Sequence, residues 1–98
     1  MAELLSNIIV EEKLKLLSNS WSQKDKFLIC KYEFKNFIDA LSFINKVGVK
    51  CEEMNHHPKW TNVYNRIEVE LFTHDSDGLT EKDFTLAKEM DTLFKNYE

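Results

Sequence analysis

A first run of hydrophobic residues near the start of the chain follows helical spacing. The pattern predicts a helix over residues 7–19, with Ser6 or Asn7 as its N-cap. The apolar positions fall on one broad face of that helix: Ile9, Val10, Leu14, Leu16 and Leu17.

Extended structure is predicted for the next two segments. Residues 20–25, which include Trp21, are typical of a short strand or of a turn into one. Residues 26–34 alternate, which predicts a strand. One face of that strand would carry Leu28, Cys30, Tyr32 and Phe34, and the other Phe27, Ile29, Lys31 and Glu33.

A longer helical pattern begins after Asn36, which is expected to act as the N-cap. The helix must end before Pro58, because a residue before proline is disfavoured in the α region. His56 would therefore lie at the helix exit, and His57 would be extended. The predicted apolar stripe is Phe37, Ala40, Leu41, Ile44, Val47, Gly48 and Cys51.

Beyond Pro58, residues 60–64 and 66–73 predict two strands with a turn at Tyr64-Asn65, although one bent strand would also fit. Residues 75–78 form a predicted turn. Thr80 would cap a final helix, with Asp83 completing a near capping box. The apolar stripe of this helix is Leu86, Met90, Leu93, Phe94 and Tyr97.

The order of these elements is α-β-β-α-β-β-α. It predicts an α+β fold in which three helices pack on one face of a four-stranded antiparallel sheet. With only two Gly and one Pro, and with no repeat or linker, the simplest organisation is a single domain over residues 1–98. A free sheet face or edge favours self-association, as a homodimer or homotetramer.

Charge and composition exclude several classes of protein. Thirteen basic residues face seventeen acidic ones, and no basic cluster forms, which argues against direct nucleic-acid binding. No apolar run approaches the length of a membrane span. The N-terminal segment lacks a basic region typical of a signal peptide, so we expect a cytoplasmic protein. Cys30 and Cys51 are expected to be buried thiols.

All three histidines lie between residues 56 and 74, and a hairpin would return His74 toward the His56-His57 pair. Imidazoles exchange protons near neutral pH, so the group is a candidate acid–base site. Glu52 and Asp75 are placed to orient an imidazole. Simpler roles stay open: Trp21, Trp60 and Tyr64 in the core, Glu52 on a solvated helix face, Asp83 as a cap only, and the histidines as surface or core residues.

Several separated motifs resemble the pterin-4a-carbinolamine dehydratases. The first is Glu52 followed by His56-His57-Pro58 and Trp60, the second is residues 62–65 (NVYN), and the third is Thr73-His74-Asp75 followed by Gly78-Leu79-Thr80 and Asp83. Trp21 and residues 32–37 extend the resemblance, which covers about residues 10 to 95. Their order and spacing make the combination specific, whereas the His-His-Pro triplet alone would be weak.

The resemblance implies dehydration of 4a-hydroxytetrahydropterin to quinonoid dihydropterin, within tetrahydrobiopterin recycling, with no metal, nucleotide or redox cofactor. It implies that His56 and His74 are the acid–base pair and that His57 binds and orients the substrate. Further site residues would be Glu52, Asp83, Trp21, Pro58 and the backbone of Thr73 to Asp75.

Two other functions remain open at this stage. Some members of the family bind the dimerisation segment of a transcription factor, so the exposed helices could pair with a partner helix, and the protein could then also be nuclear. Three imidazoles could alternatively form a zinc site of His56, His57 and His74.

Overall fold

The computed structural model describes residues 3–98 and confirms the predicted α+β fold and its element order. Two short 3₁₀ helices, η1 and η2, follow β4 and α3. The elements are α1 (Asn7–Leu14), β1 (Trp21–Lys24), β2 (Phe27–Glu33), α2 (Phe37–Met54), β3 (Lys59–Val63), β4 (Arg66–Leu71), η1 (His74–Ser76), α3 (Glu81–Phe94) and η2 (Lys95–Tyr97).

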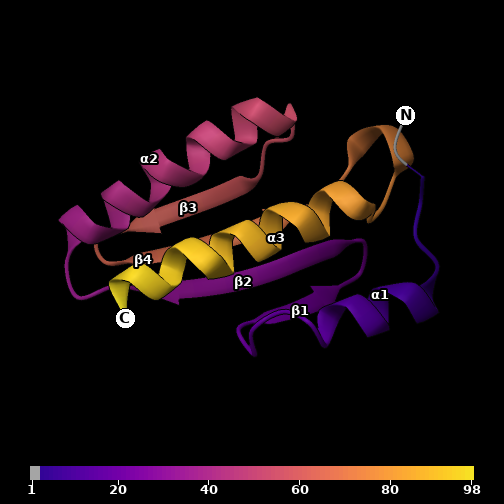
Figure 1. Ribbon diagram of the computed structural model, residues 1–98, viewed down its shortest axis with the longest axis horizontal. Helices are drawn as coiled ribbons and strands as arrows, with labels where there is room; N and C mark the ends of the chain where they lie inside the picture. The colour runs from indigo at the N-terminus through magenta and orange to yellow at the C-terminus, as the bar shows by residue number, and fades with distance from the viewer. Residues whose placement is uncertain (1–2) are drawn as a thin grey trace.

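The four strands form one antiparallel sheet in the order β1-β2-β4-β3. One row of paired residues crosses the whole sheet, from Trp21 through Cys30 and Val69 to Trp60. The two longer strands, β2 and β4, are central, whereas β1 and β3 are the edges (Figure 1).

Burial alternates along β2 and shows which face of the sheet is covered. Leu28, Cys30, Tyr32 and Phe34 are all buried, as the sequence predicts. On β4, Ile67, Val69 and Leu71 are buried in the same way. Burial of this apolar area supplies most of the driving force for folding.

Helices α2 and α3 pack over this buried face, and α1 lies beside β1 and α3 (Figure 1). An ion pair between Lys13 and Glu81 joins α1 to the start of α3. Within residues 3–98, the opposite face of the sheet carries no helix. The same residues contain no helix long and apolar enough to cross a membrane.

The first helix is shorter than predicted. It begins as expected, with the Ser6 hydroxyl accepting a hydrogen bond from the amide of Ile9, but it ends at Leu14 rather than Asn19. Leu16, which the pattern places on the apolar face, is 71% exposed. Beyond the helix, the backbone amide and the hydroxyl of Ser18 both donate hydrogen bonds to Asp91 on α3.

The predicted apolar stripe of α2 lies partly on the wrong side. Phe37 and Leu41 are exposed at 41% and 39%, whereas Phe43, which the stripe omits, is completely buried. Phe43 packs against the rings of Tyr32 and Phe34. Hydrophobic residues occur on both sides of this helix, so spacing alone does not identify the buried side.

The second hairpin consists of two strands, which excludes the single bent strand. Val63 pairs with Arg66, so Tyr64 and Asn65 form a two-residue turn, with Tyr64 at a φ of 51°. The strands are slightly offset from the predicted ranges, since β3 begins at Lys59 and β4 ends at Leu71.

Candidate functional site

The exit of α2 directs the two adjacent histidines to different environments. Asn55 adopts a left-handed conformation, φ 51°, and its amide bonds to the carbonyls of Cys51 and Glu52. The amide of His56 bonds to the Cys51 carbonyl at 3.0 Å, which completes a helix C-cap. After this turn the side chain of His56 is buried, whereas that of His57 is exposed.

The buried imidazole of His56 contacts a buried carboxylate. Its Nε2 atom lies 2.6 Å from Oδ1 of Asp83 on the first turn of α3. The side chain of His56 is 8% exposed and that of Asp83 is fully buried. Asp83 also completes the capping box with Thr80, so it is both a helix cap and the partner of a histidine.

Two threonines complete the surroundings of this carboxylate. The Thr73 hydroxyl donates to Asp83 Oδ2 at 2.8 Å, and the Thr80 amide donates to the same oxygen at 3.0 Å. The Thr73 and Thr80 hydroxyl oxygens lie 2.9 Å apart. Both threonines are buried. The carboxylate thus accepts two hydrogen bonds from the threonines in addition to its contact with His56, which compensates for the loss of its hydration.

A second histidine–carboxylate pair lies at the surface. His57 Nε2 lies 2.6 Å from Oε1 of Glu52, which is located on the last full turn of α2. The side chains are 54% and 81% exposed. Glu52 therefore contacts His57 rather than His56, so this exposed carboxylate has a side-chain partner.

His74 lies just beyond the buried network. It follows Thr73 directly, belongs to η1 and is exposed. Its ring packs edge-on against Phe72 with ring centroids 4.9 Å apart. The local turn is fixed by reciprocal backbone hydrogen bonds between Thr73 and Gly78. Asp75 is exposed in the same turn.

The structure therefore brings His56, Thr73 and Asp83 together, and it pairs His57 with Glu52. Pro58 is half-buried directly after them. Trp21 has a different environment: its indole is buried against Tyr32 and donates to Asp91, about two helical turns beyond Asp83. The sequence predicts Thr80 only as a helix cap. The contact between Thr80 and Thr73 depends on the Thr73–Gly78 pairing, which the sequence does not reveal.

Comparison with known proteins adds an independent finding to this geometry. Residues 3–93 match the family model described as pterin 4 alpha carbinolamine dehydratase. The chain belongs to this dehydratase family. The match includes every candidate site residue named above.

Members of the pterin carbinolamine dehydratase family cover nearly the whole chain. A protein of Christiangramia forsetii is 35% identical over 96 residues, which is 98% of each chain. That protein is provisionally named as a pterin-4-alpha-carbinolamine dehydratase. A protein of Prochlorococcus marinus with the same provisional name is 37% identical over 93% of this chain and 94% of its own.

Solved structures agree with this assignment. The crystal structure of a transcriptional coactivator/pterin dehydratase from Brucella melitensis has a TM-score of 0.89 and 32% identity, and the match covers 93% of this chain and 98% of that one. A pterin dehydratase-like protein identified as a RuBisCO assembly factor shares the fold, with a TM-score of 0.63 and 19% identity over 74% of this chain and 84% of its own.

The zinc site considered from the sequence is not assembled. Among residues 3–98, no group of three or more His, Cys, Asp or Glu side chains is arranged to hold a metal ion. His56 and His57 point into different environments, and each has its own carboxylate partner.

The two cysteines of this dehydratase-family chain are buried free thiols, as predicted. Burial raises the pKa of Cys30 to about 12 and that of Cys51 to about 11. Both thiols therefore stay protonated at neutral pH and are poor nucleophiles.

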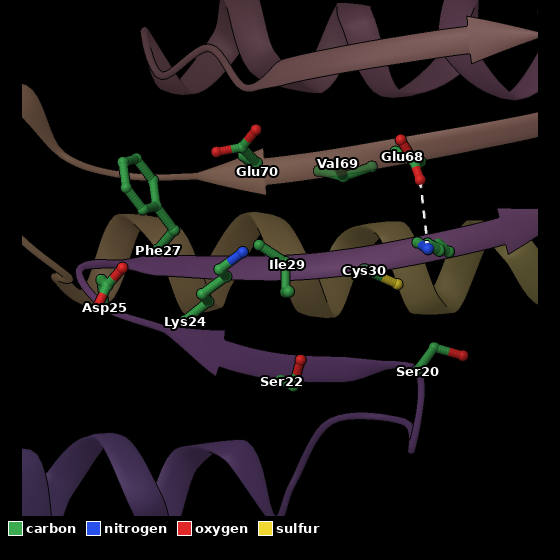
Figure 2. Close-up of a pocket in the computed structure, with 11 residues that line it drawn as sticks. Ser20, Ser22, Lys24, Asp25, Phe27, Ile29, Cys30, Glu68, Val69 and Glu70 are labelled. Carbon is green, nitrogen blue, oxygen red and sulfur yellow. Dashed lines mark ion pairs between the residues drawn. The ribbon is translucent and has the colours of Figure 1, made fainter.

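A shallow groove of about 640 Å³ lies on the opposite, open face of the sheet. Figure 2 shows its lining side chains along β1, β2 and β4, including Lys24, Ile29 and Glu70, with the helices behind the strands. Its described lining contains none of the candidate site residues. The groove is thus separate from the histidines and carboxylates of the candidate site.

Proposed function

We propose that this protein dehydrates 4a-hydroxytetrahydropterin to quinonoid dihydropterin. The observation that carries the proposal is the hydrogen bond between the His56 imidazole and the buried Asp83 carboxylate, in a chain that belongs to the pterin carbinolamine dehydratase family. Quinonoid dihydropterin is the form that is reduced back to tetrahydropterin, so the activity would serve tetrahydrobiopterin recycling. The catalytic unit would be a single domain over residues 1–98.

The reaction needs one acid and one base. The N5 lone pair forms a double bond to C4a as the C4a–O bond breaks, and an acid protonates the departing hydroxyl to give water. A base then removes the proton from N5. Each of these proton transfers is typically accelerated about 10²–10⁴-fold by a positioned side chain.

Three histidines would divide this work. His56 and His74 act as the acid–base pair, one held by Asp83 and the other at the adjacent strand end. His57 binds and orients the pterin while Glu52 fixes its ring. Gly78 already engages the amide and carbonyl of Thr73, and Asp77 donates to the carbonyl of His74. Backbone contacts to the pterin would therefore come from the amides of His74 and Asp75.

Pro58 would form an apolar wall beside these rings, since it directly follows His57 and is half-buried. We leave Trp21 out of this wall, because its indole is held by Asp91. The proposed chemistry consists of proton transfers and the loss of water, so it requires no cofactor. The proposed location of the enzyme is the cytoplasm.

The test follows dehydration of carbinolamine that is generated enzymatically in the assay. Wild-type protein should accelerate the reaction above the spontaneous rate, and His74→Ala should reduce the acceleration by about 10²-fold or more. Thr61→Ala, at an exposed position of β3, is the matched surface control and should retain full activity. A wild-type rate equal to the spontaneous rate would contradict the proposal.

The outer face of α2 carries exposed apolar residues that favour self-association. Ile38 and Val49 are 68% and 64% exposed there, and they share this face with Leu41. Gly48 lies on the same face, and an added methyl group would meet no atom within 4 Å. We propose that this face pairs with a second copy of the chain, giving a homodimer or homotetramer.

A transcription-factor segment is an alternative occupant of the same face. The only support is that the related Brucella melitensis structure is described as a transcriptional coactivator as well as a pterin dehydratase. A partner of that kind could bring the protein to the nucleus.

A further inference from the structure

The hydrogen bonds around Asp83 fix which hydroxyl group donates and which accepts, although the distances alone do not. Thr73 has a single hydroxyl hydrogen, and this hydrogen is donated to Asp83 Oδ2. The contact between the two threonine hydroxyls must therefore use the hydrogen of Thr80, with Thr73 as the acceptor. The Thr80 oxygen in turn accepts from the amide of Lys82. All donors point along this chain toward the carboxylate.

This direction fixes what Asp83 offers to His56. Oδ2 receives two donors, the Thr73 hydroxyl and the Thr80 amide, and it lies at the N-terminus of α3, where negative charge is favoured. The ionised carboxylate, which only accepts hydrogen bonds, matches this arrangement. The remaining contact, between Oδ1 and His56 Nε2 at 2.6 Å, must then use a hydrogen on Nε2.

The other ring nitrogen of His56, Nδ1, is available to exchange protons. In the part of the chain that the structure describes, Nδ1 of His56 has no hydrogen-bond partner, and no buried side-chain nitrogen or oxygen there is unpaired. Nδ1 is consequently at the accessible edge of a ring that is otherwise buried. In a neutral imidazole with hydrogen on Nε2, Nδ1 carries the free lone pair.

We propose that Thr73 and Asp83 are positioning residues that hold His56 in the Nε2–H tautomer, which makes Nδ1 the atom that exchanges protons with the substrate. The choice of tautomer rests on the hydrogen-bond network alone. The assignment of proton exchange to Nδ1 rests on the proposed dehydratase function. These two parts are tested by different measurements.

Asp83→Asn gives a sharp test because it changes one atom and reverses one donor. The Thr73 hydroxyl and the Thr80 amide require an acceptor at the Oδ2 position, so the oxygen of the substituted carboxamide must lie there. Its NH₂ group then faces Nε2 of His56, which must become the acceptor. The hydrogen of the neutral ring moves to Nδ1, and the free lone pair is lost from the accessible edge. In catalytic triads the same exchange produces the wrong tautomer and costs about 10⁴ in turnover.

The measurement is long-range ¹H–¹⁵N correlation on protein labelled with ¹⁵N-histidine, at a pH where the imidazoles are neutral. Wild-type His56 should show hydrogen on Nε2, and Asp83→Asn should show it on Nδ1. Glu52→Gln is the matched control, since it makes the same chemical change beside His57 and should alter only the His57 signals. In parallel, Asp83→Asn should lower the dehydration rate by about 10²–10⁴-fold.

A wild-type spectrum with hydrogen on Nδ1 would overturn the inference, even if the Asp83→Asn variant did not fold. Unchanged His56 signals in a folded Asp83→Asn variant would also overturn it. If the tautomers are as expected but wild-type protein does not accelerate dehydration, the positioning network stands, and the proposed function and the role of Nδ1 both fail. If the tautomer reverses while dehydration stays at the wild-type rate, Nδ1 is not the catalytic atom.

Discussion

The indole Nε1–H of Trp21 donates a hydrogen bond to Oδ1 of Asp91 at 3.0 Å. The Tyr32 hydroxyl donates to the same oxygen at 2.7 Å, and Ser18 donates to the carboxylate through its amide and its hydroxyl. One aspartate on α3 thus collects four donors from β1, β2 and the segment after α1. These hydrogen bonds explain why the Trp21 side chain is held in the hydrophobic core.

Asp91→Ala should destabilise the fold strongly. It removes the acceptor of the Trp21 and Tyr32 donors, which are only partly accessible to water, and an unpaired buried donor costs about 1–3 kcal/mol. We expect the free energy of unfolding in urea to fall by about 2–4 kcal/mol. Glu11→Ala, at an exposed position of α1, should change it by less than about 0.5 kcal/mol. Equal effects of the two substitutions would refute this role for Asp91.

Asn55 should tolerate glycine better than alanine. Its φ of 51° lies in the left-handed region, which costs most residues with a Cβ atom about 1–2 kcal/mol, whereas glycine adopts it freely and asparagine tolerates it through its short polar side chain. Asn55→Ala should lower the free energy of unfolding by about 1 kcal/mol, and Asn55→Gly should leave it nearly unchanged. Thermal or urea unfolding of both variants checks this, and the prediction fails if alanine proves as stable as glycine.

The buried thiols predict a loss of stability at alkaline pH. The pKa of Cys30 is raised to about 12 and that of Cys51 to about 11, whereas thiols in the unfolded chain ionise near a pH of about 8.5. Above that pH the unfolded state releases protons that the folded state retains, so stability falls as pH rises toward about 11–12. Burial also raises the pKa of Tyr32, which adds to the loss at high pH.

Urea unfolding of wild-type protein between about pH 7 and pH 11 measures this effect. The double variant Cys30→Ala/Cys51→Ala is less stable at neutral pH because it leaves small cavities, but its decline above about pH 8.5 should be shallower. Parallel curves for the two proteins would contradict the assignment of the decline to the thiols.

Substitutions on the outer face of α2 should change the state of association. Wild-type protein should sediment as a dimer or tetramer, and Ile38→Lys/Val49→Lys should shift it to the 11.6 kDa monomer, because lysine charges cannot be buried unpaired. Tyr64→Lys, at an equally exposed apolar position of the second hairpin, is the control and should leave sedimentation unchanged. A monomeric wild-type protein would exclude self-association through this face.

Local signals in the sequence predict most of the fold. Alternation at the end of β2, where Lys31 and Glu33 are polar, identifies its buried side. Asn36 marks the start of α2, and Thr80 with Asp83 marks the start of α3. The errors occur where a hydrophobic pattern is compatible with two different buried faces. The omission of Phe43 from the apolar stripe is an example, because α2 is hydrophobic on two sides.

The candidate site is predictable as a set of residues but not as a set of contacts. The motifs point to His56 and Asp83, yet nothing local joins residues that are 27 positions apart. The sequence predicts that Glu52 can orient an imidazole without saying which one, and the structure pairs it with His57 after the left-handed turn at Asn55. Asp91 carries no motif at all, and its role emerges only when β1, β2 and α3 are packed together.

The network of His56, Thr73 and Asp83 draws its members from the exit of one helix, the segment just after a central strand and the opening turn of another helix. No fragment that lacks any of these three segments can build it. The proposed dehydration should therefore require the complete tertiary structure. Its rate would then report whether the chain is fully folded.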